Sequence, residues 1–519
     1  MLLYLSTYIF ISIVLAGLLL TGRLRHFTHI LQLNSYYNSR YAKYFQTHLS
    51  EVFSLKMLIP LAAYSFAFWR ESLVPAFIGY ALLFLVLDML SPKQREKKPF
   101  VFTPRAKRLL FTQGAILALL FFVCFFAGNL TLVGFLVIEL LCPLIVSLAN
   151  AVNAPKEKRV NAAFTDKAKT KIGKCKDLKV IGITGSFGKT SMKNFITQIL
   201  SLRFDTLMTP GSFNTTMGVV RTINEKLSPL TDVFVCEMGA KNIGDVREIC
   251  DIVHPDIAVI TAIGEMHLDT FKSVDNVVKA KFELADAVEK EGTVFLNYDN
   301  EYIRSRSVTG KTVTYGVFPG CDFRAVNIRQ TQTGSEFEIE HAGVKSPFKS
   351  KLLGLHNVQN LTGAIAVAAH LGLEMKEIAL AVRRIEAIEH RLQIKGAAGI
   401  TLIDDAYNSN PEGAKYALEV LKNFDGYRIV ITPGMVELGE RSYELNRALG
   451  RTAAQCADYI IVVGEINLRA IADGAREANV DERRFYAAKD ISDALNQMRA
   501  INAEKKVVLL ENDLPDNYL

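Results

Sequence analysis

The sequence predicts an α-helical membrane module followed by two α/β domains. The first 150 residues hold five apolar runs, each approaching the roughly 20 residues that a bilayer-spanning helix needs. From about residue 178, short β-branched runs alternate with helical stretches, which is typical of α/β domains with a mainly parallel sheet. A second unit of the same alternation begins near residue 395. We therefore expect domains at 1–155, 156–393 and 394–519.

The apolar runs lie at about 2–21, 53–69, 72–90, 109–127 and 130–150. Any one of them could be a buried core helix. The first could also be a signal peptide, but no charged region precedes it and no small-residue cleavage site follows it. Lysines and arginines gather in the connections after the first, third and fifth runs. The positive-inside rule then predicts a multi-pass protein in a lipid bilayer, with everything after residue 150 in the cytoplasm.

The expected elements of the two α/β domains follow in chain order. In the first domain they are strands Val233–Glu237, Ile257–Thr261 and Thr293–Asn297, a small antiparallel insert at 311–350, and helices Val358–Leu371 and Met375–Ile388. In the second domain they are strands Thr401–Ile403, Arg428–Ile431, Tyr459–Val463 and Val507–Leu510.

Composition narrows the function classes. The net charge of +7 over 519 residues, with no clustering of basic and aromatic residues, does not indicate nucleic-acid binding. The seven cysteines are scattered and form no C-x-x-C motif, which indicates a reduced compartment and neither a disulfide framework nor a zinc site.

A glycine-rich turn follows the first strand of the first α/β domain. It reads Gly185-Ser186-Phe187-Gly188-Lys189-Thr190 and leads into an amphipathic run that ends at Leu200. Strand, loop and helix in this order form a phosphate cradle, in which the lysine reaches the terminal phosphates and the threonine hydroxyl ligates Mg²⁺. The strict motif has glycine where this chain has Ile183, so the loop is a relative of the P-loop. We expect a P-loop-type sheet here and a Rossmann-like second domain.

Two further side chains are predicted near the strand ends that line the crevice. Glu237 ends an apolar strand, where a carboxylate can hold Mg²⁺. His267 follows another strand and is either a structural histidine or a ligand at the same edge. Lys281 reads, from the residues alone, as a solvated helix lysine.

Eight ordered motifs over about 178–465 together resemble the Mur ligase family, most closely the branch that adds D-alanyl-D-alanine to UDP-N-acetylmuramoyl-tripeptide. They are Thr184–Thr190, Phe213–Thr215, Glu237–Ala240, Gly264–His267, Ala280–Glu283, Asn297–Asp299, Gly354–Asn360 and Asp404–Pro411. Gly434–Glu440 extends the similarity into the last domain.

This resemblance implies a cytoplasmic reaction at a bacterial cell membrane, in peptidoglycan precursor synthesis. ATP phosphorylates a peptide carboxylate, an amine attacks the acyl phosphate, and phosphate leaves. The partners it implies are a small-molecule or lipid-linked cell-wall precursor and an amino acid or dipeptide, with no nucleic acid.

The resemblance also implies residue roles. Lys189 would neutralise the β,γ-phosphates, and Thr190 and Glu237 would hold one Mg²⁺. His267 would help to bind a second Mg²⁺ with Lys281, which is a carbamylated lysine in the family. The other implied contacts are adenine at Asn357, the γ-phosphate at Arg391, ribose and domain closure at Asp405, and the substrates at Asn214, Asn408 and Asn410. For His356 we favour a packing role over catalysis.

Three departures from the family pattern concern the substrates and the domain junction. The membrane module stands in place of the uridine-diphosphate-binding domain. The family's Gly-Arg at the domain junction reads His390-Arg391. Glu511-Asn512-Asp513 stands where the branch has Lys-Gly-Ser.

Three alternatives stay open. The acceptor could be lipid-linked or polymeric and presented at the membrane. The chain could be an ATP-driven transporter, although the apolar runs show no evident charge pair. It could also be a scaffold that only binds nucleotide, which the joint presence of Glu237, His267 and Lys281 disfavours.

Overall fold

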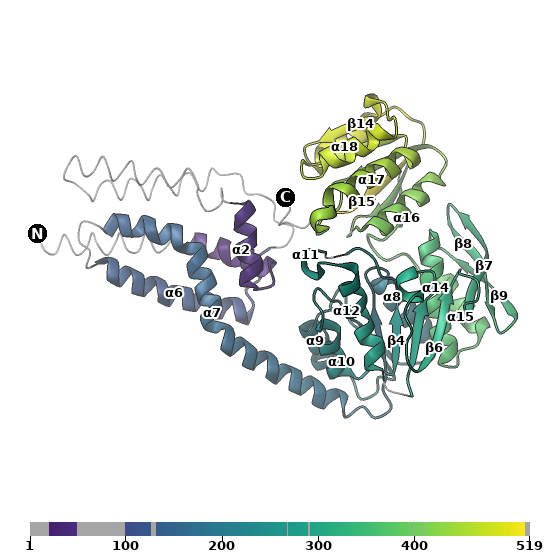
Figure 1. Cartoon of the computed structure of the whole chain (residues 1–519), viewed down its shortest axis with the longest axis horizontal. Coiled ribbons are helices and arrows are strands. Elements are labelled where there is room, and N and C mark those ends of the chain that lie inside the picture. Colours follow the sequence, from purple (N-terminus) through teal and green to yellow (C-terminus); the bar gives the residue numbers. More distant parts are fainter. Residues whose placement is uncertain are drawn as a thin grey trace, which may run out of the picture. The chain divides into compact units, whose positions relative to one another are not determined.

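The structure is a computed structural model that describes residues 20–48, 99–125, 131–266, 268–288, 291–397, 399–407 and 409–513. The chain divides into two compact units, one within residues 1–162 and one spanning Ala163–Leu514. Figure 1 shows helices in the first unit and α/β architecture in the second. Two predicted site residues, His267 and Asn408, lie outside the described residues.

The first unit is helical throughout its described part. It contains a helix at 20–33, α2 (Asn38–Thr47), α6 (Pro104–Phe125) and most of α7 (Thr131–Ile172). Two segments, Pro104–Val123 and Val137–Ile172, are long and apolar enough to cross a membrane. They correspond to the predicted runs at 109–127 and 130–150. The other three predicted runs lie outside the described residues, apart from positions 20 and 21.

The helices of this unit pack around a continuous apolar core. Phe27 and Leu31 from the first helix, Leu109 from α6 and Val146 from α7 are fully or almost fully buried in it. Arg23 lies 3.7 Å from Glu139 of α7, with both side chains mostly buried. Glu139 lies inside the predicted run 130–150 and Arg23 lies two residues after the predicted run 2–21, so this pair joins one run to the segment that follows another.

The middle domain is built on a nine-stranded sheet with the order β2-β3-β1-β4-β5-β6-β7-β8-β9. The strands are β1 (Lys179–Thr184), β2 (Thr206–Met208), β3 (Val233–Glu237), β4 (Ile257–Ile260), β5 (Thr293–Asn297), β6 (Lys311–Gly316), β7 (Phe323–Thr331), β8 (Gly334–His341) and β9 (Val344–Ser350). Pairs from β2 through β7 are parallel, and β7-β8 and β8-β9 are antiparallel.

Helices cover both faces of this sheet (Figure 1). Alternation along β1 explains why, since Ile181 and Ile183 enter one apolar core while Val180 enters the other. The first core is closed by α8 (Lys189–Leu200), α14 (Leu355–His370) and α15 (Met375–Arg384). The second is closed by α9 (Thr216–Lys226), α10 (Asp245–Val253) and α12 (Val274–Ala287).

The region 311–350, predicted as a small antiparallel insert, contains the antiparallel strands β7–β9, which continue the main sheet. β6 pairs with β5 in parallel, and Tyr315 and Gly316 then pair with Phe323 and Arg324. The antiparallel strands therefore extend the main sheet. The fully buried Tyr315 side chain donates a hydrogen bond to the carbonyl of Ile260 on β4, at 3.1 Å, which ties this extension to the centre of the sheet.

The C-terminal domain is a second α/β domain, built on a six-stranded sheet with the order β10-β11-β15-β12-β13-β14. Its strands are β10 (Gln393–Ala397), β11 (Ile400–Asp405), β12 (Tyr427–Thr432), β13 (Tyr459–Val463), β14 (Phe485–Ala488) and β15 (Lys506–Glu511). Its helices are α16 (Pro411–Lys422), α17 (Ser442–Cys456), α18 (Leu468–Glu477) and α19 (Ile491–Ala500). All pairs are parallel except β10-β11, so the prediction of two α/β domains is confirmed.

Candidate active site

The turn between β1 and α8 requires glycine at two positions. Gly185 has φ +154° and Gly188 has φ +80°, conformations that residues with side chains rarely adopt. A β-carbon on Gly185 would collide with the Thr261 hydroxyl, and one on Gly188 would lie 2.9 Å from Asn360 Oδ1. The turn leads directly into the N-terminus of α8, where free N–H groups and the helix dipole favour an anion.

Neighbouring strands hold this turn in place. The Ser186 N–H donates to the carbonyl of Ala262 at 2.7 Å, and the Ser186 hydroxyl exchanges hydrogen bonds with the backbone of Gly264. The carbonyl of Phe187 accepts from the Thr261 hydroxyl at 2.6 Å. The loop is therefore fixed to the end of β4 before any ligand arrives, which lowers the entropic cost of binding one.

Lys189 lies over the loop that precedes it. Its Nζ donates to the carbonyls of Gly185 at 2.7 Å and Ser186 at 2.9 Å. Burial lowers the pKa of Lys189 to about 8, with Glu237 opposing this shift and Arg391 adding to it. The structure therefore places the Lys189 side chain against the glycine-rich turn, and its contact with phosphate stays a prediction.

Glu237, at the end of β3, is the centre of a buried polar cluster. Its Oε1 accepts from Asn214 Nδ2 at 3.0 Å and from the Thr190 hydroxyl at 3.2 Å. Its Oε2 accepts from Lys193 Nζ at 2.9 Å, and both side chains are 1% exposed. Burial raises the pKa of this carboxyl, but Lys193, Lys189 and Asn214 outweigh burial and bring the pKa below its usual value.

Lys193 is the residue of this cluster that the sequence analysis missed. It lies one turn after Lys189 on the buried face of α8 and also donates to the carbonyl of Gly211 at 2.6 Å. Its position four residues after the loop lysine places it on the same helix face, but its pairing with Glu237 depends on how α8 packs on the sheet.

Lys281 is a buried lysine on α12 and is 3% exposed, not the solvated residue that its local sequence indicated. Burial and the nearby charge of Lys189 lower its pKa well below the usual value. Within the described part of the chain, no group of three or more His, Cys, Asp or Glu is placed to hold a metal ion. His267, the predicted partner of Lys281, lies outside that part.

Arg391, in the connection between the domains, adds a second cation to this region. Its guanidinium lies 4.5 Å from the centre of the Tyr407 ring. Burial, and then the charge of Arg391, lower the pKa of His356 to about 4, and the buried His356 Nδ1 has no hydrogen-bond partner. A neutral histidine that packs near Tyr416, with ring centres 5.4 Å apart, agrees with the packing role favoured for it.

Asp405 and Glu511 form an acidic pair at the carboxyl ends of neighbouring strands, opposite each other in the β11-β15 register. Asp405 Oδ1 accepts from the N–H of Leu392 at 3.1 Å, and Glu511 Oε1 accepts from the Ser409 hydroxyl. Burial raises the pKa of Asp405 to about 6, and burial together with Asp405 raises the pKa of Glu511 well above its usual value.

Two predicted contact residues have local hydrogen bonds instead of open side chains. Asn357 is buried in the first turn of α14 and donates to the carbonyl of Leu353 at 2.8 Å. Asn410 is the N-cap of α16, where its Oδ1 accepts from the N–H of Gly413 at 3.0 Å. Their contacts with adenine and substrate remain predictions.

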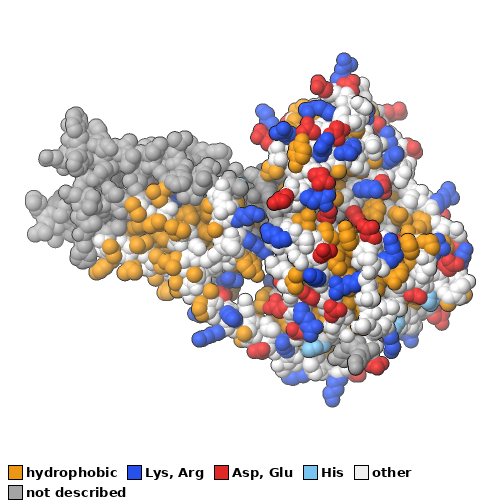
Figure 2. All heavy atoms as spheres, in the orientation of Figure 1, with side chains coloured by type: hydrophobic (Ala, Val, Ile, Leu, Met, Phe, Trp, Pro, Cys, Tyr) orange, Lys and Arg blue, Asp and Glu red, His pale blue; other side chains and the backbone are white. Residues whose placement is uncertain are grey.

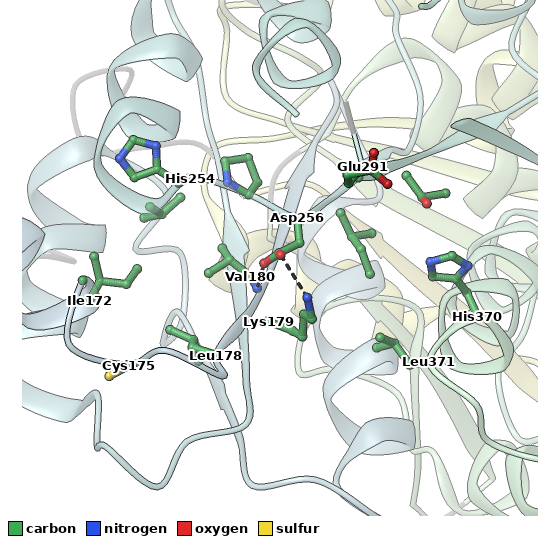
Figure 3. A pocket seen from close by; sticks show the side chains of 16 residues that line it. Ile172, Cys175, Leu178, Lys179, Val180, His254, Asp256, Glu291, His370 and Leu371 are labelled. Atoms are coloured by element: carbon green, nitrogen blue, oxygen red, sulfur yellow. Dashed lines mark hydrogen bonds and ion pairs between the residues drawn. The ribbon is translucent and has the colours of Figure 1, made fainter. Parts of the chain in front are cut away.

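A pocket of ≈ 390 Å³ lies at the opposite edge of the middle sheet (Figure 3). It is lined by the amino ends of β1, β4 and β5, including Lys179 and Asp256, which are paired at 3.2 Å. The glycine-rich turn follows the carboxyl end of β1, so this pocket is separate from the candidate active site.

Comparisons with known proteins cover both α/β domains. Residues 183–368 match the family described as Mur ligase middle domain, and residues 390–511 match Mur ligase, glutamate ligase domain. The UDP-N-acetylmuramoyl-tripeptide--D-alanyl-D-alanine ligase of Escherichia coli (strain K12) is 30% identical over 339 residues, covering 64% of this chain and 73% of the relative. The ligase of the same name from Bacillus subtilis (strain 168) is 29% identical over 338 residues, covering 64% and 72%.

Among solved structures, a crystal structure of MurF from Acinetobacter baumannii superposes with a TM-score of 0.63 at 27% identity, covering 69% of this chain and 78% of that one. Both family matches lie within residues 183–511, so the helical unit falls outside them. From sequence and structure alike, this chain belongs to the Mur ligase family of ATP-dependent, amide-forming ligases.

Proposed function

We propose that this chain joins D-alanyl-D-alanine to UDP-N-acetylmuramoyl-tripeptide in peptidoglycan precursor synthesis, with ATP as the energy source. The observation that carries this proposal is the cluster at the carboxyl edge of the middle sheet, where Lys189, Thr190 and Lys193 surround Glu237 behind a glycine turn. The relatives from Escherichia coli and Bacillus subtilis bear this activity in their names.

The reaction has two bond-forming steps. A carboxylate oxygen of the tripeptide attacks the γ-phosphorus of ATP, an O–P bond forms, and the bond to the β,γ-bridging oxygen breaks to release ADP. The amine nitrogen, having lost a proton, then attacks the acyl carbon and releases inorganic phosphate. Both steps concentrate negative charge on phosphoryl oxygens, so positioning and charge neutralisation supply most of the catalysis.

The chain's own residues divide this work. Lys189 and Arg391 neutralise phosphate oxygens, and the Gly185–Gly188 turn binds phosphate through backbone N–H groups. Asn214 positions the acceptor carboxylate near Glu237, to which its amide is hydrogen-bonded at 3.0 Å. Asp405, at the domain junction, binds the ribose when the domains close.

The donors present suit Mg²⁺, which prefers hard oxygen ligands. Thr190 Oγ1 and Glu237 Oε1 are 3.2 Å apart, and the low pKa of Glu237 keeps it ionised. These two residues would hold the first ion, and His267 with Lys281 would hold the second. Bound Mg²⁺ supplies positive charge beside the phosphates.

Lys281 has the chemistry that carbamylation requires. A lysine must be neutral to add to CO₂, and the lowered pKa of Lys281 favours the neutral amine. In carbamylation the neutral amine nitrogen attacks CO₂, an N–C bond forms as one C–O π bond opens, and the nitrogen loses a proton to solvent, which leaves an anionic carbamate as an oxygen donor. Incubation with ¹³C-bicarbonate should give a carbamate signal by NMR that is absent in Lys281→Ala, and a wild-type enzyme with no such signal would contradict this role.

The function itself is tested by product identification. We expect the full-length enzyme, given ATP, Mg²⁺, D-alanyl-D-alanine and UDP-N-acetylmuramoyl-tripeptide, to release ADP and to yield the pentapeptide by mass spectrometry. ADP release in the absence of any amine or acceptor would favour a transporter or another ATPase. No turnover with any peptide acceptor would overturn the ligase proposal.

A second candidate acceptor is lipid-linked. The helical unit, with two membrane-length helices, precedes the matched domains and is where substrate recognition is expected. In this version the chain is a multi-pass protein of a bacterial cell membrane, with both catalytic domains in the cytoplasm. Turnover of the soluble UDP-linked tripeptide at the same kcat/KM as its lipid-linked counterpart would exclude a lipid-only acceptor.

A further inference from the structure

The end of the helical unit where α6 begins carries an arginine with no described counter-ion. Arg105, the second residue of α6, donates from one terminal nitrogen to Asn150 Oδ1 at 3.4 Å. Its guanidinium lies 4.1 Å from the centre of the Tyr36 ring, and its buried Nε has no hydrogen-bond partner. Among the described residues, no carboxylate is within ion-pair distance of this half-buried cation.

The next arginine on α6, in contrast, has a carboxylate partner. Arg108 lies one turn later, and its Nε and a terminal nitrogen donate to the two carboxylate oxygens of Glu157 at 2.6 and 2.8 Å. Such a two-pronged pair satisfies charge and geometry together. Arg105 has the same fork of donors but faces an amide and an aromatic ring, so it can receive an anion that is not part of the chain.

The surroundings of Arg105 are held rigidly. Asn150 Nδ2 donates to the carbonyl of Tyr36 at 2.9 Å and to Asn38 Oδ1 at 2.8 Å, joining α7 to the turn before α2. Ser35 and Tyr36 both adopt left-handed conformations, with φ of 57° and 61°, at this turn. These hydrogen bonds fix the position of the Tyr36 ring against which the Arg105 guanidinium lies.

The electrostatics at this end favour an anion. Thr103 caps α6 by accepting from the N–H of Ala106 at 3.1 Å, and no acidic residue lies in the first turn of the helix. The positive end of the helix dipole therefore adds to the charge of Arg105. A second arginine of this unit, Arg25, lies 5.8 Å and 5.4 Å from the rings of Phe100 and Phe102, just before the start of α6.

Exposed apolar side chains surround this basic end. Tyr37, Val101 and Phe102 are 57%, 56% and 53% exposed, and Phe111 on α6 is 81% exposed. Figure 2 shows hydrophobic side chains gathered over the described helices of this unit. Aromatic and basic residues at the end of long apolar helices are typical of the membrane–water interface.

We propose that Arg105, Tyr36 and Asn150 form a binding site for the phosphate or diphosphate group of a membrane lipid. The aromatic face and the amide position the guanidinium, which binds the phosphate oxygens, while the exposed apolar side chains contact the acyl or polyprenyl chain. Only the idea that this lipid carries the acceptor peptide rests on the proposed ligase function. The anion site itself depends on the helical unit alone.

The test uses the full-length protein in a neutral detergent, with saturating ADP and Mg²⁺ to fill the nucleotide site. One arm titrates inorganic diphosphate, and the other titrates dioleoyl phosphatidic acid in mixed micelles. We expect Arg105→Gln to weaken binding of phosphatidic acid at least tenfold. Lys107→Gln, a matched loss of charge at an exposed position two residues later on α6, should weaken it less than threefold.

The two arms distinguish the sources of the phosphate. Binding of phosphatidic acid alone identifies a lipid headgroup site, and equal binding of both compounds identifies a site for free phosphate, which would overturn the lipid assignment. Equal losses in Arg105→Gln and Lys107→Gln, or no binding in either arm, would overturn the site. Arg105→Lys, which keeps the charge without the fork, should give an intermediate loss and guards against a folding defect.

Lipid binding at this site and ligase activity can be tested independently. Lys189→Ala should abolish ligation and leave binding of phosphatidic acid intact, because Lys189 lies in the second unit. Loss of lipid binding in that variant would contradict an independent site in the helical unit.

Discussion

The two sheets of the second unit differ in the charged groups at their carboxyl edges. At the middle sheet, Lys189 and Lys193 surround one carboxylate, Glu237, whose pKa is lowered. At the C-terminal sheet, Asp405 and Glu511 face each other, and the pKa of both is raised. The first edge therefore holds two lysines beside one ionised carboxylate, and the second holds two buried carboxyl groups with Arg391 nearby.

The comparison also shows how a buried carboxyl group is accommodated in two ways. Glu237 stays ionised because the nearby lysine charges offset the free-energy cost of removing its carboxylate from water. The Asp405–Glu511 pair instead lowers its charge by retaining a proton. Variants at the two edges should therefore respond to pH in opposite directions.

The largest effect is expected from Lys189→Ala, which removes the cation above the glycine turn. Loss of charge neutralisation on the transferred phosphoryl group should lower kcat/KM roughly 10³-fold, about 4 kcal/mol. ADP release under saturating amine measures this. Lys176→Ala, an exposed lysine before β1, is the matched control and should retain activity. A Lys189→Ala enzyme within tenfold of wild type would contradict the assignment of this edge to phosphate.

Lys193→Met should be the most damaging change to stability at the same edge. It leaves the Glu237 carboxylate, 1% exposed, without its ion-pair partner, at a cost of about 3 kcal/mol in the free energy of unfolding. Because the pKa of Glu237 is lowered in the folded wild type, its contribution to stability is present above the unfolded pKa and is lost as pH falls through the folded pKa.

Urea unfolding at pH 7.5 and at pH 4 measures this prediction. The difference between wild type and Lys193→Met should shrink at the lower pH, where Glu237 accepts a proton in the variant. The double variant Lys193→Met/Glu237→Gln should recover part of the loss at neutral pH. A single variant as stable as wild type would show that the buried pair contributes little.

Glu511→Gln should shift the pH dependence of stability in the direction opposite to Lys193→Met. The pKa of Asp405 is raised to about 6, and that of Glu511 is raised well above its usual value. Stability is therefore complete below the unfolded pKa near 4 and is lost as pH rises through the folded values. Removing one carboxyl group should raise the free energy of unfolding at pH 8 by roughly 2 kcal/mol and leave it nearly unchanged at pH 4.

Thermal unfolding across pH 4–8 checks this change, and Glu504→Gln, in the loop before β15, serves as the control. A Glu511→Gln variant that is less stable than wild type at pH 8 would mean that the pair is held by hydrogen bonds worth more than its charge repulsion.

Much of this contrast could be predicted from the sequence. The glycine turn and the position of Glu237 at a strand end follow from local pattern, since each motif residue directly follows or ends an apolar run. The burial of Lys281 and the pairing of Lys193 with Glu237 could not, because both depend on which helix face meets the sheet. The continuation of β7–β9 into the main sheet likewise depends on pairing with β6, which local periodicity does not encode.

The smallest effect is expected at His390, where the family pattern has glycine. His390 has φ +59°, a left-handed conformation that costs a residue with a side chain roughly 1 kcal/mol. Its Nδ1 is 2.9 Å from Asp404 Oδ2, and Lys395 Nζ lies 2.7 Å from the same oxygen.

The hydrogen bond between His390 and Asp404 offsets the backbone strain, so His390→Gly, which removes both, should change the free energy of unfolding by less than about 0.5 kcal/mol. His390→Ala keeps the strain, loses the hydrogen bond and should lose about 1 kcal/mol. Both variants lose the bond to Asp404, so they differ only in the cost of the left-handed backbone. Equal stability in urea unfolding would show that this backbone cost is negligible.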